Sequence, residues 1–354
     1  MKRRICVILG LGLALSAAAG HGEWKMQIHS GATVDEYNVA DIDSMTFTDS
    51  DIPIPGMVLV PAGVFIMGDG VSYCGIDQLQ VTLTHDFLMD QTEVTNQEYM
   101  EALQWAYNNG YVTTTASAVL DNLDGSSVEL LDLDQAACEI QFSAGTFYLR
   151  ESPSSEAQNA YPGGYDPSVH PVIMVTWYGA ARYCDWLSLQ AGYPRAYEHS
   201  GNWTCNGGYP YGAQGFRLPT NAEQEYAEQY DDERIYPWGN EAPDCTRANY
   251  RTGSQSFCVG WTAPVGNYPA APASLEIFDL AGNVLEWCND WFVCDLGTTP
   301  LINPPGPTSG DGRVLRGGSW NTMSGSLACA LRQYGLPTYQ IFQAGFRTVK
   351  TVTP

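Results

Sequence analysis

The chain has 354 residues, enough for one large domain or two ordinary ones. Its net charge of −23 produces a surface that repels phosphates, which argues against nucleic acids and anionic membranes as partners. Only 16% of the residues are charged, whereas Gly, Trp and Tyr are plentiful, and this composition favours a loop-rich extracellular fold over a helical bundle.

The N-terminus has the pattern of a secretory signal peptide. Three basic residues at Lys2–Arg4 precede an apolar run over Ile5–Leu15, and small residues around Ala19-Gly20 offer a cleavage site. The apolar run is too short to span a bilayer, and no other stretch is long enough. We therefore predict a signal peptide at residues 1–20, no membrane span, and a mature protein secreted to the periplasm or the cell exterior.

A small β-appendage and a linker are expected at residues 21–50, ahead of the main domain. Alternating apolar and polar residues over Lys25–His29 predict one strand, and Asp41–Phe47 predicts a second. The prolines of Asp49–Pro55 are typical of a linker. The main domain should then occupy residues 56–350.

Short strands dominate the start of the main domain. Two apolar strands that meet at a Pro-Ala-Gly turn within Met57–Gly68 form a hairpin pattern. Val81–Met89 is expected to be one further strand. A helix should then begin after Thr95, an N-cap whose capping box is completed by Glu98, and run to about Tyr107.

An insertion is expected at residues 110–171. Within it, Ser127–Leu133 and Glu139–Leu149 have the pattern of two strands of one hairpin. Long ordered insertions often carry function, so this segment is a candidate for the protein's individual specificity. A hairpin without a role of its own is an equal alternative.

Two further helices and two strands complete the pattern. Apolar residues recur at helical spacing over Trp177–Leu189, and Thr220 caps a short helix to about Tyr230. After a long loop region, strands are expected at Arg313–Arg316 and Gly345–Val349. Few helices, many short strands and long loops predict an irregular α+β domain.

The cysteines are compatible with disulfides in an exported protein. Ten are present, and removal of Cys6 with the signal peptide leaves nine, so at least one stays unpaired or pairs between molecules. Cys245 and Cys258 flank a short loop and are expected to pair, whereas Cys288 and Cys294 bracket a possible strand end. The absence of a C-x-x-C motif argues against a zinc ribbon or a thioredoxin-like site.

Familiar catalytic patterns are missing from the sequence. It has no H-E-x-x-H, no G-x-S-x-G, no P-loop and no dinucleotide fingerprint, and its five histidines are scattered. Four local motifs remain, and for the arginines that three of them contain we favour ion pairs or aromatic stacking over catalysis. These motifs are Phe216–Tyr226, Tyr236–Asn240, Arg316–Asn321 and Ala344–Arg347.

The stretch Asp279–Trp291, with the sequence DLAGNVLEWCNDW, stands out. A tight turn at Gly282 followed by a strand explains the glycine and the two tryptophans. It does not explain why Asp279 and Glu286 bracket the turn. Carboxylates beside a strained turn and large aromatic residues are typical of a cation-stabilised loop anchored in a core.

Eight motifs in family order resemble the formylglycine-generating enzyme, or sulfatase-modifying factor, family. They are Met57–Gly68, Thr92–Tyr99, His170–Trp186, Arg217–Tyr226, Pro237–Asn240, Asp279–Trp291, Arg316–Asn321 and Gly345–Arg347. The resemblance covers most of the predicted main domain and excludes the appendage. It implies a C-type-lectin-related fold with little regular secondary structure.

The resemblance also implies an oxidation chemistry, which depends on two cysteine positions that can be checked in this sequence. Active members of the family oxidise a sulfatase cysteine to formylglycine with copper held by two cysteines, which follow a Gly-Gly-Ser-aromatic motif. By similarity, Thr322 stands at the first of these positions and the second falls near Leu327, while Cys329 fits a later, structural cysteine. Copper(I) needs soft thiolate ligands, so copper and the oxidase chemistry are expected to be absent.

The calcium site of the family fits better. Position by position, its ligands are the side chains of Asp279 and Glu286 and the backbone carbonyls of Gly282 and Val284. All four are oxygen donors, which suit a hard cation. The resemblance therefore implies one structural calcium ion at this turn.

A second calcium site of the family begins at a position matched by Asn249-Tyr250. Its acidic partner falls near Phe257, where no acid is present. We expect this site to be lost and the Cys245–Cys258 disulfide to replace it.

Three functions remain open. We favour a secreted, calcium-stabilised binding or accessory module for an unidentified extracellular protein or glycan, because the scaffold motifs are complete and the copper thiolates are missing. The second is a formylglycine-generating oxidase that assembles its site from Cys329 and another thiol. The third is a different enzyme on this scaffold, such as a non-haem iron type, whose separate His-rich domain is not seen here.

Overall fold

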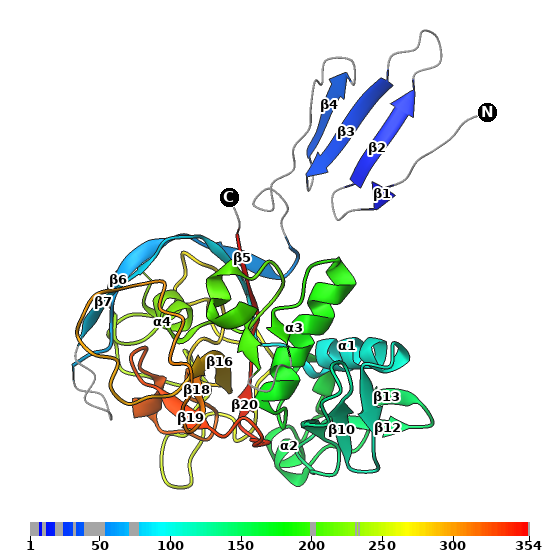
Figure 1. Cartoon of the computed structure of the whole chain (residues 1–354). Coiled ribbons are helices and arrows are strands. Elements are labelled where there is room, and N and C mark those ends of the chain that lie inside the picture. The colour runs from blue at the N-terminus through cyan, green and yellow to red at the C-terminus, as the bar shows by residue number, and fades with distance from the viewer. Residues whose placement is uncertain are drawn as a thin grey trace. The chain divides into compact units, whose positions relative to one another are not determined.

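The computed structural model describes residues 7–8, 12–17, 24–30, 33–38, 54–70, 78–198, 203–230, 232 and 234–352. The chain forms two compact units, Met1–Pro55 with Val352–Pro354, and Gly56–Thr351 (Figure 1). No helix among the described residues is long and apolar enough to cross a membrane.

The first unit contains a four-stranded antiparallel sheet. Its order is β1 (Val7–Ile8), β2 (Gly12–Ala17), β3 (Trp24–Ser30) and β4 (Thr33–Asn38). β3 confirms the strand predicted at Lys25–His29, whereas β1 and β2 fall within the predicted signal peptide. The strand predicted at Asp41–Phe47 and the cleavage site near Ala19-Gly20 lie outside the described residues.

The second unit combines a few helices with small sheets and long loops, which confirms the predicted irregular α+β class. Its described α-helices are α1 (Asn96–Asn108), α2 (Ser155–Ala160), α3 (Trp177–Ala191) and α4 (Asn221–Gln229). Its central sheet has the order β19 (Gln333–Gly335), β18 (Arg313–Arg316), β16 (Leu285–Trp291) and β20 (Ala344–Gly345).

Two three-stranded sheets lie outside the central sheet, and one of them contains both ends of this unit. One has the order β17 (Leu301–Ile302), β7 (Leu79–Leu83) and β6 (Gly63–Met67), and the other β21 (Val349–Thr351), β8 (Phe87–Asp90) and β5 (Met57–Val60). Their inward-facing side chains share one apolar cluster with residues of α4, including Ala222 and Tyr226.

The remaining described strands belong to the insertion and to a short ribbon. They are β9 (Val112–Thr114), β10 (Ala118–Asp121), β11 (Glu129–Asp132), β12 (Ile140–Ser143), β13 (Thr146–Leu149), β14 (Tyr197–Glu198) and β15 (Thr204–Cys205). Single 3₁₀ turns lie at η3 (Pro167–Val169), η4 (Asn206–Gly208), η5 (Pro210–Gly212) and η6 (Ser324–Leu327).

The helices predicted from their caps are confirmed. Thr95 and Glu98 form the predicted capping box at the start of α1. Thr220 and Glu223 form another at the start of α4. In both boxes the hydroxyl and the carboxylate satisfy backbone N–H groups that the first helical turn leaves free.

The hairpin predicted within Met57–Gly68 is wrong in its pairing. β5 pairs with β8 and β6 pairs with β7, so the chain changes sheets at the Pro-Ala-Gly turn. The amide of Ala62 donates to Asp86 Oδ1 at 2.8 Å instead of closing a hairpin. A Cβ at Gly63 would lie 2.0 Å from Tyr226 Oη, so the glycine serves a close approach to α4.

Two strands predicted as continuous are interrupted. Val81–Met89 contains a break at residues 84–86, after which β8 joins a different sheet from β7. Gly345–Val349 divides into the end of β20 and the start of β21. In both places the chain crosses between sheets, a long-range event that local alternation does not reveal.

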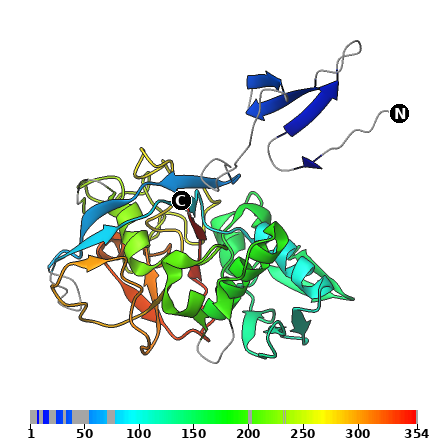
Figure 2. The same cartoon turned by 45° about the horizontal axis from the view of Figure 1, so that its top comes forward.

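The insertion forms a lobe beside α1 (Figures 1 and 2), but the predicted pairing of its strands is wrong. β11 pairs with β10, and Glu139–Leu149 folds into a hairpin of its own, β12–β13. Ala144 and Gly145, with φ of 50° and 86°, provide the two left-handed residues of its tight turn.

We predict that Gly179→Ala destabilises the protein although alanine favours helices. A Cβ there would lie 2.3 Å from the carbonyl oxygen of Leu130 in β11 and 2.9 Å from Tyr99 Oη. The free energy of unfolding in urea should fall by about 1–3 kcal/mol. Gly163→Ala, at an exposed glycine with nothing within 4 Å, is the control and should change it by less than about 0.5 kcal/mol. Equal stability of the two variants would contradict the close packing of α3 on the insertion.

Candidate functional site

The turn before β16 is held in a strained conformation by its neighbours. Asp279, Gly282 and Asn283 all have positive φ, of 58°, 86° and 57°. The amide of Gly282 donates to the Gly317 carbonyl at 2.8 Å, and that of Asn283 to the Asn249 carbonyl at 2.9 Å. A Cβ at Gly282 would lie 2.6 Å from that same Asn249 oxygen, so only glycine fits there.

Glu286, predicted as a calcium ligand, is already engaged in an ion pair. Arg347 donates to both of its oxygens, from Nε and Nη2 at 2.7 Å each, and Gln224 Nε2 donates to Oε2 at 3.0 Å. Glu286 and Arg347 have no exposed surface. This bidentate geometry neutralises the carboxylate and occupies both oxygens.

Asp279 is different, because one of its oxygens lacks a partner. Oδ2 accepts a hydrogen bond from the Gly266 amide at 2.6 Å, whereas Oδ1 is buried without a hydrogen bond among the described residues. Burial raises the pKa of Asp279 to about 6. Nearby Glu93 likewise has a buried, unpartnered Oε2, and burial followed by the charge of Asp279 raises its pKa.

These contacts fit a cation only in part. Buried, unsatisfied carboxylate oxygens at Asp279 and Glu93 are donors that a hard cation takes. Glu286, however, is occupied by Arg347. Among the described residues, no three His, Cys, Asp or Glu side chains are grouped to hold a metal. The calcium site at Asp279, Gly282, Val284 and Glu286 therefore stays a prediction, with Asp279 as its best-placed side chain.

The positions matched to the copper cysteines come together around the Gly-Gly turn. Gly317 and Gly318 have φ of 83° and 75°. A Cβ at Gly318 would lie 3.1 Å from Thr322 Oγ1 and 3.0 Å from Leu327 Cδ2. The fold thus brings the side chains of Thr322 and Leu327 to the same point.

Both side chains have structural contacts at that point. Thr322 Oγ1 accepts from the Ser319 amide at 2.8 Å and donates to the Ser319 carbonyl at 3.1 Å, which closes the turn. Leu327 is 1% exposed and packs in a small apolar cluster that includes Tyr250. A hydroxyl and an isobutyl group provide no soft donor for copper(I).

Cys329, the thiol nearest in sequence, lies in the interior. It is 1% exposed, and burial raises the pKa of its thiol well above the usual range. Its amide donates to the Ile235 carbonyl, and its carbonyl accepts from Arg316 Nη1. All free cysteines among the described residues are buried, and a buried neutral thiol is a poor nucleophile and metal ligand.

The predicted disulfide between Cys245 and Cys258 is confirmed, with Cα atoms 5.3 Å apart. It closes a loop that supports the segment after the Gly-Gly turn, because the Arg251 amide donates to the Thr322 carbonyl at 2.9 Å. Cys294 is also disulfide-bonded, whereas Cys288 is free and buried.

The structural role predicted for the motif arginines is supported by their contacts. Arg217 pairs with Glu223 at 2.6 Å, and Arg316 pairs with Glu225. All four side chains are buried. These pairs join the first half of α4 to neighbouring segments, so the arginines hold the scaffold together.

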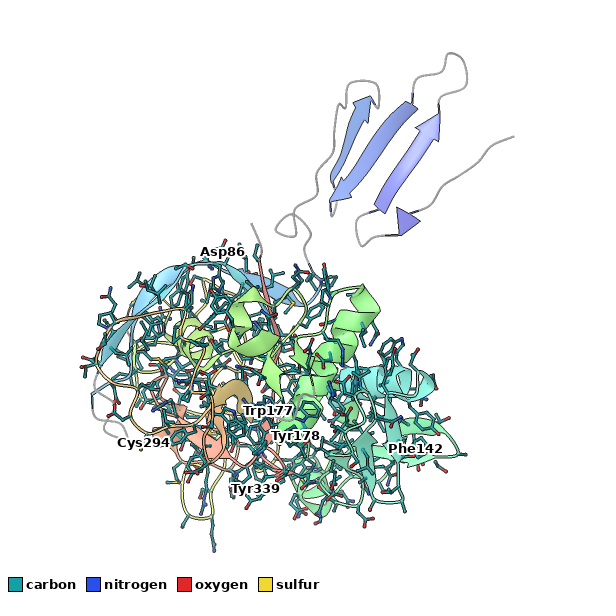
Figure 3. All side chains as sticks on the ribbon, in the orientation of Figure 1. Asp86, Phe142, Trp177, Tyr178, Cys294 and Tyr339 are labelled. Atoms are coloured by element: carbon teal, nitrogen blue, oxygen red, sulfur yellow. A yellow bond between two sulfur atoms is a disulfide. The ribbon has the colours of Figure 1, made fainter. Side chains whose placement is uncertain are left out.

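Sequence reasoning missed an exposed apolar surface, here called the apolar face. It consists of Met323, Tyr334, Leu336, Tyr339 and Phe342, each at least 39% exposed. Figure 3 shows Tyr339 at the lower edge of the domain.

Buried Trp320 supports part of this face, with ring centroids 5.8 Å from Phe342 and 6.1 Å from exposed Phe257. One sequence signal for the face was available: no Asp or Glu follows Asp311 in this very acidic chain. Most of the face comes from residues 334–342, and exposed apolar groups that gather in this way mark interaction sites.

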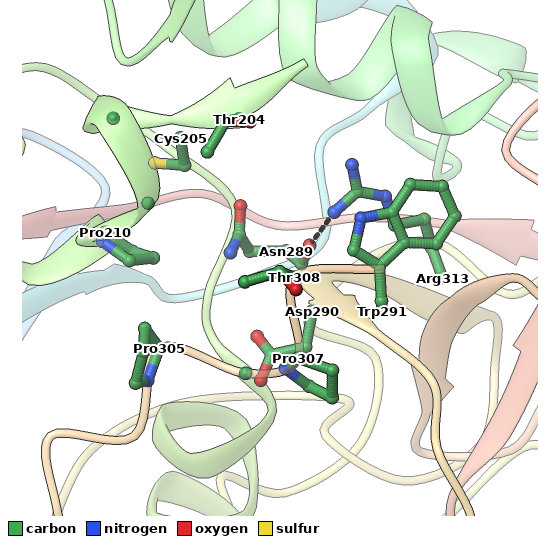
Figure 4. Close-up of a pocket in the computed structure, with 13 residues that line it drawn as sticks. Thr204, Cys205, Pro210, Asn289, Asp290, Trp291, Pro305, Pro307, Thr308 and Arg313 are labelled. Atoms are coloured by element: carbon green, nitrogen blue, oxygen red, sulfur yellow. Dashed lines mark hydrogen bonds between the residues drawn. The ribbon is translucent and has the colours of Figure 1, made fainter. Parts of the chain in front are cut away.

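A separate cavity of about 230 Å³ lies between β15, β16 and residues 305–308 (Figure 4). Arg313 lines it and stacks between Trp177 and Trp291, 3.7 and 3.9 Å from the ring centroids. Asp290 Oδ2 accepts from the Asn221 amide at 3.0 Å. These contacts stabilise β16, β18 and the start of α4.

Comparison with known proteins identifies the family. Residues 44–352 match the sulfatase-modifying factor enzyme 1-like domain. This match covers far more than half of the chain. The chain therefore belongs to this family, as its eight motifs indicated.

Curated relatives include enzymes of this family. The chain is 28% identical to the formylglycine-generating enzyme of Mus musculus, over 90% of this chain and 81% of the relative. It is 28% identical to the formylglycine-generating enzyme of Thermomonospora curvata, over 84% and 97%. It is also 29% identical to the serine/threonine-protein kinase pkn1 of Chlamydia caviae, over 84% of this chain but only 38% of that relative's length.

Solved structures share the fold. Treponema denticola variable protein 1 matches with a TM-score of 0.58 and 24% identity, over 83% of this chain and 94% of the other. CarF matches with a TM-score of 0.53 and 21% identity, over 84% and 98%. At these identities the likeness concerns the fold alone.

We predict that calcium raises the melting temperature of the protein and that a chelator lowers it. An ion that binds only the folded state at about 100 times its Kd adds about 2.7 kcal/mol. Asp279→Asn should abolish the shift, because it removes the negative charge of the carboxylate whose Oδ1 has no partner. Glu101→Gln, on the exposed side of α1, is the charge-matched control and should keep it. A melting temperature indifferent to calcium and chelator would overturn the calcium assignment.

Proposed function

We propose that this protein is a secreted binding or accessory module of the family and not a cysteine oxidase. The observation that carries the proposal is the point beside Gly318, where the family's two copper cysteines would meet. Thr322 and Leu327 converge there, and neither side chain binds copper(I). Buried ion pairs, including Glu286–Arg347, hold the surrounding scaffold together.

Three features support an extracellular binding role. The signal peptide pattern at residues 1–20 and the Cys245–Cys258 disulfide are typical of exported proteins. The apolar face adjoins the turn at Ser319–Thr322, because Met323 follows Thr322 and Phe342 packs on Trp320. A calcium ion at Asp279 would stabilise the turn before β16.

The alternative is an oxidase that converts a sulfatase cysteine to formylglycine. It would need Cys329 and a second thiol at an accessible site, but the free thiols of the described residues are buried. This alternative is supported by the formylglycine-generating enzymes among the relatives. The donor set beside Gly318 favours the binding role.

We expect the purified protein, supplied with copper(I) and a Cys-x-Pro-x-Arg peptide, to produce no formylglycine detectable by mass spectrometry. The double variant Thr322→Cys/Leu327→Cys restores two thiols at the converging positions and should gain tight copper(I) binding, measured by competition with a chromophoric chelator. The Thermomonospora curvata enzyme serves as the positive control for the peptide assay.

Conversion of the peptide by the wild-type protein would refute the hypothesis that the protein is a binding module. Loss of that conversion in Cys329→Ser would then assign the activity to an unexpected thiol site. A wild-type protein that bound copper(I) as tightly as the double variant would equally contradict the proposal.

A further inference from the structure

Buried arginines in this protein fall into two groups. Four bind carboxylates: Arg182 with Asp121 and Asp185, Arg217 with Glu223, Arg316 with Glu225, and Arg347 with Glu286. Arg313 and Arg332 have no carboxylate within 4.0 Å among the described residues, although they are only 4% and 6% exposed. A buried charge without a counter-ion is costly and calls for an explanation.

Arg313 is explained by its surroundings. Its guanidinium stacks between Trp177 and Trp291. It also donates to the Asn289 carbonyl at 2.5 Å and to the Trp203 carbonyl at 3.5 Å. Two aromatic faces and two carbonyl oxygens stabilise the cation inside the fold.

Arg332 has far fewer partners. Its one hydrogen bond among the described residues runs from Nη2 to the Cys294 carbonyl at 2.9 Å. Nε, like that of Arg313, is buried without an acceptor, and Phe292 is the one ring beneath the guanidinium among the described residues, at 5.2 Å. Burial lowers the pKa of Arg332 to about 10, so the group still carries its charge at neutral pH.

Arg332 lines a hollow of about 370 Å³ that is open at the surface. The other lining residues are Phe292, Ser326, Leu331, Gln333 and Tyr334. Phe292 and Tyr334 stack with centroids 4.6 Å apart and form an aromatic wall. Ser326 and Gln333 add side chains that donate hydrogen bonds. The hollow thus offers a fixed cation, two neutral polar groups and an aromatic wall.

The hollow and the apolar face share Tyr334. The chain carries a net charge of −23, yet no acid follows Asp311 in the segment that contains Arg332 and the apolar face. The segment therefore contributes no carboxylate of its own that would compete for the cation or repel an anionic group. Glu225 and Asp290 of neighbouring elements act on Arg332 electrostatically but form no ion pair with it.

From this geometry we propose that the Arg332 hollow binds a carboxylate side chain of a protein partner whose apolar surface covers the apolar face. The proposal rests on the binding role proposed above and names its ligand. Nη1 and Nη2 of Arg332 supply the donors for the carboxylate, and Ser326 and Gln333 supply further ones. Met323, Leu336 and Phe342 have no hydrogen-bonding side chains to offer a sugar, which favours a protein over a glycan.

The test is selection from a phage-displayed random peptide library on the immobilised full chain. Peptides with Asp or Glu at one position among apolar residues should be enriched. Synthetic copies of these peptides should bind at least about tenfold more weakly to Arg332→Gln, and copies with that Glu changed to Gln should lose as much on the wild type. Arg150→Gln is the matched control, because Arg150 also binds only backbone carbonyls, those of Cys138 and Gln135, and should keep full affinity.

A second variant keeps the test decisive if Arg332→Gln fails to fold. Ser326→Phe fills the hollow and leaves Arg332 in place, so it should weaken binding to the same extent. Enrichment of apolar peptides without a carboxylate would overturn the role of Arg332 but leave the binding module standing. No enrichment of any peptide would overturn both. Carboxylate peptides that bind both variants with wild-type affinity would place their site elsewhere and contradict the proposal.

Discussion

The second unit depends on the buried ion pair between Glu286 and Arg347. Both side chains are excluded from solvent, and both carboxylate oxygens are bound. The remaining donors of Arg347 reach the carbonyls of Asp90 and Phe278, at 3.0 Å each. One guanidinium thus ties β16, the end of β8, the turn before β16 and the last segment of the chain together. Loss of either partner would leave a buried charge, at a cost of about 3–5 kcal/mol. The same pair explains why the acid that looked like a metal ligand in the sequence is occupied.

Local chemistry was predictable from the sequence, whereas long-range pairing was not. The capping boxes at Thr95 and Thr220 define their helices from four residues each, and both were found where expected. The turn in Met57–Gly68 has an equally clear pattern, but its two strands join different sheets. Gly63 is needed there because Tyr226, more than a hundred positions away, lies against it. Strand partners are chosen by such contacts, which alternation within one segment does not encode.

The candidate site likewise has a part that the sequence predicted and a part that it did not. The family register placed Thr322 and Leu327 at the ligand positions, and the fold brings both side chains to one point beside Gly318. The unpaired state of Arg332 was invisible, because a missing partner is a property of the whole fold. A single signal in the sequence pointed toward it, the lack of acids after Asp311. The net charge of the whole chain does not show this signal, because it suggests a uniformly acidic surface.

The two unpaired arginines are buried at the same cost, but the fold surrounds them to different extents. Arg313 is enclosed by two tryptophans and two carbonyls, although its Nε has no acceptor among the described residues. Arg332 has one carbonyl and one distant ring, beside a hollow that opens to the surface. If Arg332 served the fold alone, an apolar side chain of similar size would serve it at least as well, because an uncompensated buried charge opposes folding. A partner that completes the contacts of Arg332 explains why an arginine is present there. Binding of that partner then offsets the free-energy cost of burying its charge.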